Sequence, residues 1–401
     1  MNLLGIIAEY DPFHRGHQYH ISASREISGA DGVICVLSGD FTQRGGPAFL
    51  DKFARSEMAV RGGADLVIEL PLPWAMAGAE TFARGGVGLL CALGCVDTLS
   101  FGSECGDADR LRATAELLLK PELEDALREQ LSLGLPYAAA REKAVELLSG
   151  EENAVLLRQG NNILGIEYCK ALLLRQSPIR PLSIKRDSSA HNGRGSASEL
   201  RTRYAEGEDI SADLPDGSAA VLRRSQEPGR VADPQRLETA LLSRLRMLSE
   251  ADFHALPDCA EGLENRLYRS ARLLGSEKAI LDAAASKRYP RARLRRMLWS
   301  AALGLRKEDS EGIPPYIRPL CANEKGREIL HELKKTASLP ILSRGGAVKE
   351  LDERGKRVFR LCANAHDFYV LGYSDQNSRD SDEDYQNTGG FFVISNIAFS
   401  Q

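Results

Sequence analysis

The sequence lacks the features that mark a membrane or secreted protein. No apolar run reaches the roughly 18 residues that a membrane-spanning helix requires, and no basic stretch precedes the first apolar residues. The eight cysteines form no Cys-x-x-Cys pair, and Cys91 and Cys95 have a helical spacing in an apolar segment. This spacing favours reduced core thiols over a zinc site or disulfides. We therefore expect a cytoplasmic protein without membrane contact or a tightly bound metal.

The sequence also lacks an excess of positive charge. The formal net charge is −4, so the overall field does not attract nucleic acid, and such a partner would have to bind a local basic patch. The 401 residues, 43% of them hydrophobic, are enough for two or three domains with full cores. The composition does not indicate an oligomeric state.

The first half of the chain alternates strand-like and helix-like segments. Amphipathic or small-residue stretches at 51–61 and Ala79–Leu93 separate short apolar runs at Leu3–Ala8, 32–37, Leu66–Leu70, 98–101 and 179–184. This alternation predicts an α/β fold with a doubly wound parallel sheet. Polar residues follow three of the predicted strands, at 14, 38–40 and 102–104, and the carboxyl ends of parallel strands form one crevice. The sequence thus predicts a ligand site at that edge of the sheet.

The turn after the first strand carries the most specific motif, His14-Arg15-Gly16-His17. Gly16 lets a backbone approach a ligand closely, and a helix that starts here offers unpaired N–H groups to phosphate. His14 and His17 can donate hydrogen bonds to the charge that builds on a triphosphate. The alternative is a polar turn in which the histidines only cap the helix or bond locally.

Beyond the fifth predicted strand the residue composition of the sequence changes. A Gly/Ser-rich loop spans 188–198, and past about residue 215 helices rich in Leu, Ala and Arg predominate, so we place a domain boundary at 207/208. The predicted domains are 1–207, an ATP-binding catalytic domain, and 208–401, a mainly helical domain. Segment 374–384 is acidic and serine-rich and is predicted to be mobile, and 391–399 is predicted to form a strand.

The helical half contains one dense basic run, at 287–296. This run is a candidate tRNA-binding surface because several cations on one helix can contact a phosphodiester backbone. The alternative is a solvated helix face balanced by acidic residues. The candidate residues are Lys287, Arg288, Arg291, Arg293, Arg295 and Arg296.

Taken together, the motifs resemble those of the bacterial tRNA(Met) cytidine acetate ligase family, within the nucleotidyltransferase-like superfamily. The resemblance covers essentially the whole chain and rests on the order and spacing of the motifs at 5–20, 38–45, 51–52, 101–104, 161–168, 196–201, 261–266, 291–303 and 316–330. It implies a Rossmann-like nucleotidyltransferase domain. It also implies a ligase that activates acetate with ATP as acetyl-adenylate and acetylates the exocyclic amine of the wobble cytidine in elongator tRNA(Met), with release of AMP and pyrophosphate.

The resemblance also implies roles for individual residues. His14, His17, Lys52 and Arg201 are the expected catalytic residues, and Gln43 and Arg44 are the expected acetate-binding residues. Asp51 and Lys52 can equally form a structural ion pair, and Ser196 and Ser198 can simply cap a helix. The expected ATP-binding residues are Ile7, Ala8, Glu9, Tyr10, Pro12, Phe13, His14, Gly16, His17, His20, Gly102, Asn161, Asn162, Arg186, Ser196, Ser198 and Arg201.

Two further expectations concern the nucleotide. Mg²⁺ is expected to accompany ATP, although no carboxylate cluster marks a dedicated site. Segment 187–192 departs from the family pattern that we expect there, Gly-x-x-Tyr-His-Asp, which leaves the contacts of Arg186 open.

Two other functions are compatible with the motifs. An adenylyltransferase that acts on a small phosphorylated metabolite would need only the first domain, whereas this chain continues for about two hundred residues with a basic run. A non-catalytic nucleotide sensor or RNA-binding protein on the same fold would be expected to lose one of the two histidines or Arg201, and the sequence retains all three.

Overall fold

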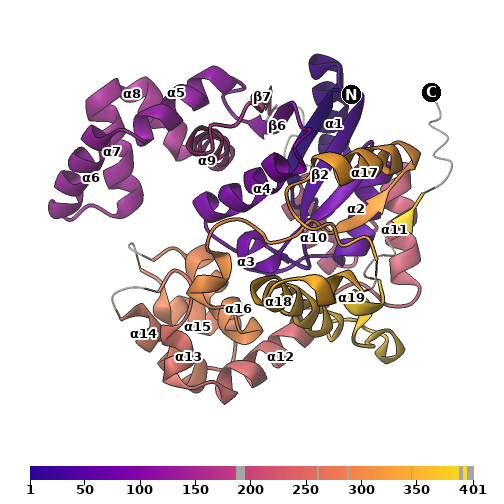
Figure 1. The fold of residues 1–401 in the computed structure, drawn as a ribbon. Helices are drawn as coiled ribbons and strands as arrows, with labels where there is room; N and C mark the ends of the chain where they lie inside the picture. The colour runs from indigo at the N-terminus through magenta and orange to yellow at the C-terminus, as the bar shows by residue number, and fades with distance from the viewer. Residues whose placement is uncertain (187–194, 260–261, 287–288, 345, 388–391, 395–401) are drawn as a thin grey trace.

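The computed structural model describes residues 1–186, 195–259, 262–286, 289–344, 346–387 and 392–394. A seven-stranded sheet forms its centre, with strand order β7-β6-β1-β2-β5-β8-β9 (Figure 1). All neighbouring strands are parallel except β5 and β8. The strands are β1 (Leu3–Ala8), β2 (Gly32–Ser38), β5 (Leu66–Leu70), β6 (Thr98–Ser103), β7 (Arg180–Lys185), β8 (Pro319–Ala322) and β9 (Phe392–Val393).

Side chains of the central strands alternate between two cores, as the two-residue period of a strand requires. In β1, Leu3 and Ile7 face one core and Leu4 and Ile6 face the other. The first core is completed by α4 (Ala79–Leu93), α9 (Gly160–Leu174), α17 (Glu324–Thr336) and α18 (Glu353–Val370). The second is completed by α1 (Arg15–Ser28), α2 (Lys52–Arg61), α10 (Ala197–Ala205) and α11 (Asp216–Gln226). The predicted doubly wound sheet is confirmed.

Helix α4 lies very close to the sheet. A Cβ atom at Gly86 would lie 2.7 Å from Ile7 Cδ1, so the small residues of α4 allow it to approach β1. This contact fixes the helix directly behind the strand that carries the histidine motif.

Two helical regions extend from the sheet (Figure 1). One contains α5 (Ala108–Leu118), α6 (Pro121–Ser132), α7 (Tyr137–Ser149) and α8 (Glu151–Ala154). The other has its own apolar core and contains α12 (Pro234–Met247), α13 (Glu250–His254), α14 (Leu263–Leu273), α15 (Glu277–Ala284) and α16 (Arg291–Leu303). Shorter elements used below are β3 (Phe41–Thr42), β4 (Gly46–Pro47), α3 (Leu72–Ala75), η3 (Lys307–Ser310) and α19 (Glu383–Gln386).

The predicted division at 207/208 does not separate two independent cores. Strands β8 and β9 and helices α17 and α18 come from the second half of the chain, yet they complete the sheet and its first core. The second half is mainly helical, as predicted, but it is not a separate body. Of the predicted C-terminal strand at 391–399, the described part is Phe392–Val393, and the predicted loop at 188–198 lies largely outside the described residues.

The prediction that 374–384 is mobile is wrong at its end. Asp384 is fully buried and accepts hydrogen bonds from Lys52 and Arg318. Acidic composition predicts solvation only where the carboxylates lack buried cations as partners. In the described residues, no helix is long and apolar enough to cross a membrane.

Candidate active site

The turn after β1 holds both histidines of the motif in a fixed arrangement. His14 is the N-cap of α1, and its Nδ1 accepts a hydrogen bond from the Gly16 amide at 3.0 Å. His17 Nδ1 accepts from the His14 amide at 3.3 Å, and the two ring centroids lie 3.8 Å apart. Because Nδ1 is the acceptor in each ring, a neutral imidazole here carries its hydrogen on Nε2. The helix cap thus determines the tautomer. The two histidines can therefore cap the helix through Nδ1 and donate a hydrogen bond through Nε2 at the same time.

The surroundings keep His17 and His20 neutral. Burial, reinforced by the nearby His14, His20 and Arg186, lowers the pKa of His17 well below its ordinary value. Burial and Arg186 lower the pKa of His20 to about 4. A cluster of neutral donors beside a cation suits an anionic ligand, since a phosphate would meet N–H groups and positive charge there.

Packing below the motif explains its rigidity. Tyr10, Phe13 and His17 form an aromatic cluster with centroid separations of 4.8 to 5.6 Å, and Tyr10 and Phe13 are buried. Tyr10 has a φ of 46°, a left-handed conformation that costs a residue with a side chain on the order of 1 kcal/mol or more. Tertiary packing holds that conformation. Ile7 and Ala8 end β1, Glu9 and Pro12 lie in the turn, and Gly16 lies in the first turn of α1.

A second group of predicted residues lies where β6, β7 and the start of α9 meet. Glu104 accepts hydrogen bonds from the Asn162 amide at 2.8 Å and from Asn161 Nδ2 at 2.7 Å. Arg186 Nη1 donates to Asn161 Oδ1 at 3.3 Å. A Cβ atom at Gly102 would lie 3.2 Å from Arg186 Cγ, so a bare backbone adjoins the guanidinium stem. The structure brings Gly102, Asn161 and Arg186 together.

Asn162 has a different place from Asn161. It is fully buried, its Oδ1 accepts from the amides of Glu104 and Cys105, and its Nδ2 donates to Gln159. These bonds use the side chain to hold the β6–α5 turn, so Asn161 is the better placed of the two to contact a ligand. His20 Nε2 lies 3.2 Å from Ser100 Oγ on β6, which ties α1 to this corner.

Helix α10 brings its arginine to the histidine turn. Arg201 Nη1 lies 3.1 Å from Asp11 Oδ2 and also donates to the Asp11 carbonyl. Ser196 is the N-cap and accepts from the Glu199 amide at 3.3 Å, whereas Ser198 is exposed in the first turn of α10. The start of this helix and Arg201 therefore flank the turn from the second-core side of the sheet.

The loop that carries the expected acetate residues is fastened to the same turn. The Gln43 amide donates to Glu9 Oε1 at 2.6 Å, and burial raises the pKa of Glu9 above its ordinary value. Gln43 Nε2 is buried and has no hydrogen-bond partner among the described residues, and Arg44 is exposed. An unsatisfied buried donor beside the turn marks a place for an acceptor such as a carboxylate oxygen.

Sequence reasoning missed the residue that holds these loops together. Arg55 on α2 is fully buried and donates to the carbonyls of Glu9 at 2.6 Å, Ser38 at 3.0 Å and Leu50 at 2.9 Å. It thereby joins the ends of β1 and β2. A single arginine in an amphipathic segment gives no sequence signal for this role, because its partners are backbone carbonyls.

Lys52 is not brought to the crevice. Its side chain is 0% exposed, and Nζ lies 2.6 Å from Asp384, 3.1 Å from Glu69 and 3.6 Å from Asp40. Three carboxylates at this distance leave no place for a phosphate, so the structural ion pair accounts for Lys52 and the expected catalytic role is corrected. Burial disfavours its charge, but Asp384 and Glu69 outweigh burial and raise its pKa above the ordinary value.

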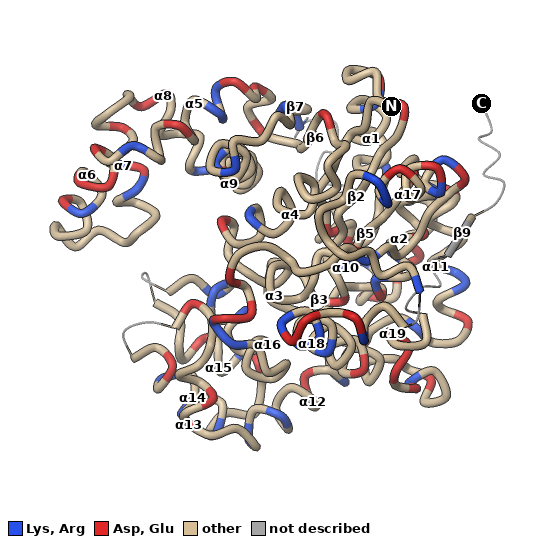
Figure 2. The backbone as a smooth tube through the Cα atoms, in the orientation of Figure 1, with Lys and Arg blue, Asp and Glu red and all other residues tan. Residues whose placement is uncertain are grey.

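The basic run on α16 is largely paired within the protein. Arg291 pairs with Asp282, and Arg295 Nε lies 2.6 Å from Glu277. Arg293 donates to the Asp258 carbonyl at 2.6 Å, and Arg296 donates to the Gln43 carbonyl at 3.3 Å. Lys287 and Arg288 lie outside the described residues. Figure 2 shows both basic and acidic residues along α15 and α16, so acidic residues accompany the described part of the basic run.

Comparison with known proteins identifies the family. A family model described as HIGH Nucleotidyl Transferase matches residues 1–384. The Acetivibrio thermocellus protein named tRNA(Met) cytidine acetate ligase is 37% identical over 96% of this chain and 98% of its own length. The protein of the same name from Thermoanaerobacter sp. (strain X514) is 39% identical over 94% and 97%. This chain belongs to that ligase family.

A solved structure agrees with this assignment. The crystal structure of Thermotoga maritima TmcAL bound with alpha-thio ATP matches with a TM-score of 0.92 at 35% identity, and the match covers 98% of this chain and 100% of that one. The family, the fold class and the enzyme class predicted from the sequence are confirmed. In the part of the chain that the structure describes, no group of three or more His, Cys, Asp or Glu side chains is arranged to hold a metal ion.

Proposed function

We propose that this chain uses ATP to join acetate to the exocyclic amine of the wobble cytidine in elongator tRNA(Met), in the cytoplasm. The observation that carries the proposal is the pair His14 and His17 at the end of β1, whose Nδ1 atoms are both acceptors, so that each neutral ring carries its hydrogen on Nε2. Two such donors at a helix N-terminus suit a displacement at ATP, and relatives of this chain are named tRNA(Met) cytidine acetate ligase.

In the first step, an acetate oxygen attacks the α-phosphorus of ATP, and the bond to the β-phosphate oxygen breaks to release pyrophosphate. His14 and His17 donate to phosphate oxygens as negative charge builds on the leaving group. Arg201 and the start of α10, with Ser196 and Ser198, close on the triphosphate from the other side. Mg²⁺ bound together with ATP would neutralise part of the triphosphate charge, beside the donors of His14, His17 and Arg201.

The nucleoside end of ATP extends toward the second group of residues. Gly102 offers bare backbone on which ribose or adenine can pack, and Asn161 and Arg186 supply hydrogen bonds. Acetate binds at the 42–46 loop, which the Gln43 amide holds against the histidine turn, and there Gln43 Nε2 donates to its carboxylate and Arg44 adds charge. An acetate oxygen bound there attacks the α-phosphate, so the reaction is chiefly one of positioning.

In the second step, N4 of the cytidine attacks the carbonyl carbon of acetyl-adenylate, and the bond from that carbon to the AMP oxygen breaks. The amine must lose a proton. Glu9 is placed to accept it, because its Oε1 is held by the Gln43 amide beside the acetate loop, and its raised pKa makes it a better base than an ordinary carboxylate.

Incubation of the full chain with ATP, acetate and unmodified tRNA tests the proposal. We expect mass analysis of the nucleosides to reveal N4-acetylcytidine, and we expect acetate to be required for exchange of labelled pyrophosphate into ATP. A protein that exchanges pyrophosphate only with a small phosphorylated metabolite would be an adenylyltransferase instead, and one that binds ATP without exchange would be a sensor.

A further inference from the structure

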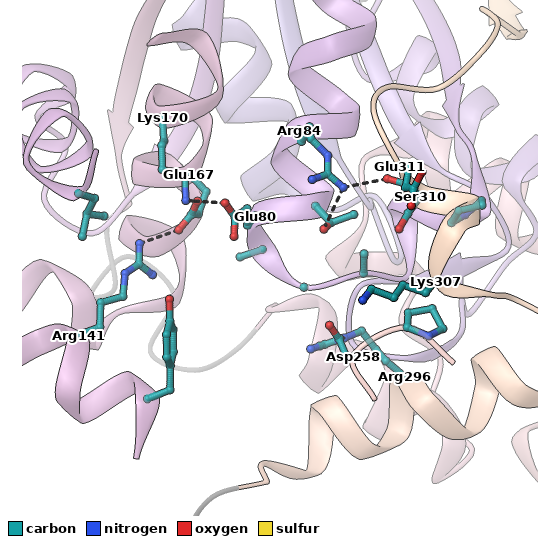
Figure 3. A pocket seen from close by; sticks show the side chains of 18 of the residues that line it. Glu80, Arg84, Arg141, Glu167, Lys170, Asp258, Arg296, Lys307, Ser310 and Glu311 are labelled. Atoms are coloured by element: carbon teal, nitrogen blue, oxygen red, sulfur yellow. Dashed lines mark hydrogen bonds and ion pairs between the residues drawn. The ribbon is translucent and has the colours of Figure 1, made fainter. Parts of the chain in front are cut away.

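A cavity of about 870 Å³ lies between the two helical regions, apart from the histidine turn (Figure 3). One wall comes from α4, α6, α7 and α9, and the other from α16, η3 and the loop at Asp258. The volume is within the range of nucleotide and drug-sized sites. Neither wall belongs to the residues that we assign to ATP or acetate.

Three cations on this cavity lack neutralising carboxylates at close range. Arg84 donates to the Ser310 carbonyl at 2.8 Å, and among the described residues no carboxylate lies within ion-pair distance of Arg84 or of Lys307. Arg296 has only Asp258, at 4.0 Å. The Nε atoms of Arg84 and Arg296 are buried and have no hydrogen-bond partner in the described part of the chain. Buried donors of positive charge without acceptors call for an anion.

The pKa of Arg296 also indicates that its charge lacks a close counter-ion. Its pKa is lowered, first by burial and then by Arg293, with Asp258 opposing only in part. The positive charge is thus incompletely compensated inside the protein. An oxygen anion in the cavity would supply the missing acceptor.

Acidic residues on the opposite wall are already engaged. Glu167 lies 2.7 Å from Arg141 and 2.9 Å from Lys170, and Glu80 lies 2.8 Å from Lys170 (Figure 3). These pairs engage the acids of that wall with Arg141 and Lys170, and among the described residues neither Glu311 nor Glu124 of the lining forms an ion pair with Arg84 or Lys307. The same wall carries Tyr137, a residue that is 60% exposed and whose ring can stack on an unpaired base.

Two observations place the cavity next to the crevice. Arg296 lines the cavity and also donates to the carbonyl of Gln43, in the acetate loop. A Cβ atom at Gly45 would lie 2.5 Å from the Arg296 amide, so loop and helix are in direct contact. On α9, Glu167 follows Asn161 by six residues, a rise of about 9 Å at 1.5 Å per residue.

We propose that this cavity holds the unpaired RNA strand beside the target cytidine, with phosphates on Arg84, Arg296 and Lys307 and a base on Tyr137. The inference rests on the proposed function. A cytidine that reacts at N4 must leave the stack of its loop, so its neighbours need a surface that binds phosphates and supports an exposed base next to the reaction centre. The charge and the aromatic ring favour RNA over an acidic peptide.

The test uses the full chain and compares a Lys307→Glu/Tyr137→Ala double variant with wild type. Both positions are exposed, so the fold is preserved. We expect tRNA affinity to fall by about 10-fold or more and the slope of log affinity against log salt to decrease by roughly one unit. Acetate-dependent pyrophosphate exchange without tRNA should stay within about 2-fold of wild type.

Arg84→Gln gives a second, independent variant, because glutamine can keep the bond to the Ser310 carbonyl while it removes the charge. Lys335→Glu, at an exposed cation on α17, is the control and should leave tRNA binding unchanged. Unchanged affinity and salt slope in both cavity variants would overturn the proposal. Binding of cytidine monophosphate to the same variants is measured as well. If the variants lose this binding but keep tRNA binding, the cavity is a site for small anions and the proposal is overturned. Absence of exchange in wild type would instead refute the proposed function.

Discussion

Replacement of Lys52 by methionine separates the structural role that the geometry assigns from the catalytic role expected from sequence. Lys52 is completely buried, and the carboxylates of Asp384, Glu69 and Asp40 lie within 3.6 Å of its ammonium group. Methionine conserves much of the volume and removes the charge, so at least one carboxylate loses its cation. We expect the free energy of unfolding to fall by about 3–5 kcal/mol, the cost of breaking a buried ion pair from one side.

This cost translates into a modest shift of melting temperature because the chain is long. With an unfolding entropy of about 2.1 cal/mol/K per residue, 1 kcal/mol corresponds to roughly 1.2 °C for a chain of this length that unfolds as one unit, so we expect a decrease of about 4–6 °C. Calorimetry measures this decrease in melting temperature. Lys335→Met, at a pair that is 60% and 41% exposed, is the matched control and should cost at most about 1 kcal/mol.

The buried ion pairs of Lys52 have two further consequences. The deficit of Lys52→Met should be smaller at pH 5 than at pH 8, because the orphaned carboxylate can take up a proton at low pH. Acetate-dependent pyrophosphate exchange per folded molecule should stay within about 3-fold of wild type. A variant with the wild-type melting temperature and a loss of exchange of about 10²-fold would refute the structural role and restore the catalytic one.

Three other perturbations have defined outcomes. His14→Ala or His17→Ala should lower pyrophosphate exchange by about 10²-fold with little change in stability, and near-normal exchange in a folded double variant would exclude the pair as donors. Burial opposes the charge of His366, but Asp40 and Glu383 outweigh burial and raise its pKa to about 10, so its stabilising contribution is complete below pH 6.5 and is lost as the pH rises toward 10. Denaturant unfolding should therefore show an alkaline decline that His366→Gln flattens, and parallel profiles would contradict this. A fragment that ends at residue 207 should fail to fold, since it lacks β8 and β9; a folded fragment with wild-type ATP affinity would show that the N-terminal part is autonomous.

The central strands could be predicted because their signal is local. Leu3–Ala8 and Leu66–Leu70 were predicted with the bounds that the structure has, and both are short apolar runs closed by polar or turn residues. Strand β8 could not be placed in the same way. Pro319–Ala322 is four residues long and pairs antiparallel with β5, some 250 positions earlier, and its apolar pattern does not distinguish it from a turn between helices.

The residues of the candidate site also divide into those with local contacts and those with long-range contacts. The histidine turn depends on residues within four positions of one another, so the sequence contains the cap, the tautomer and the spacing. The environment of Lys52 depends on Asp384, 332 positions away, and an Asp-Lys pair at a helix start has the same sequence whether the lysine meets a phosphate or a carboxylate. Local pattern therefore predicts which groups exist, and tertiary contact decides which of them reach the crevice.

Glu9→Gln is the change that separates the two steps of the proposed reaction. The glutamine carbonyl can still accept the hydrogen bond from the Gln43 amide, so the acetate loop should keep its place and acetate-dependent exchange should stay within about 3-fold of wild type. Transfer to tRNA should fall by about 10² to 10⁴-fold, because the amide cannot take the amine proton. Single-turnover transfer from preformed acetyl-adenylate measures this step.

The pH dependence gives the second readout. Burial raises the pKa of Glu9, and only the deprotonated carboxylate can act as the base, so wild-type transfer should rise with pH through that raised value. The rise should be absent in Glu9→Gln. If exchange and transfer fall together, Glu9 positions the loop for both steps rather than accepting a proton. If transfer is unchanged, the amine proton leaves by another path, and the Glu9 carboxylate serves only to hold the Gln43 amide.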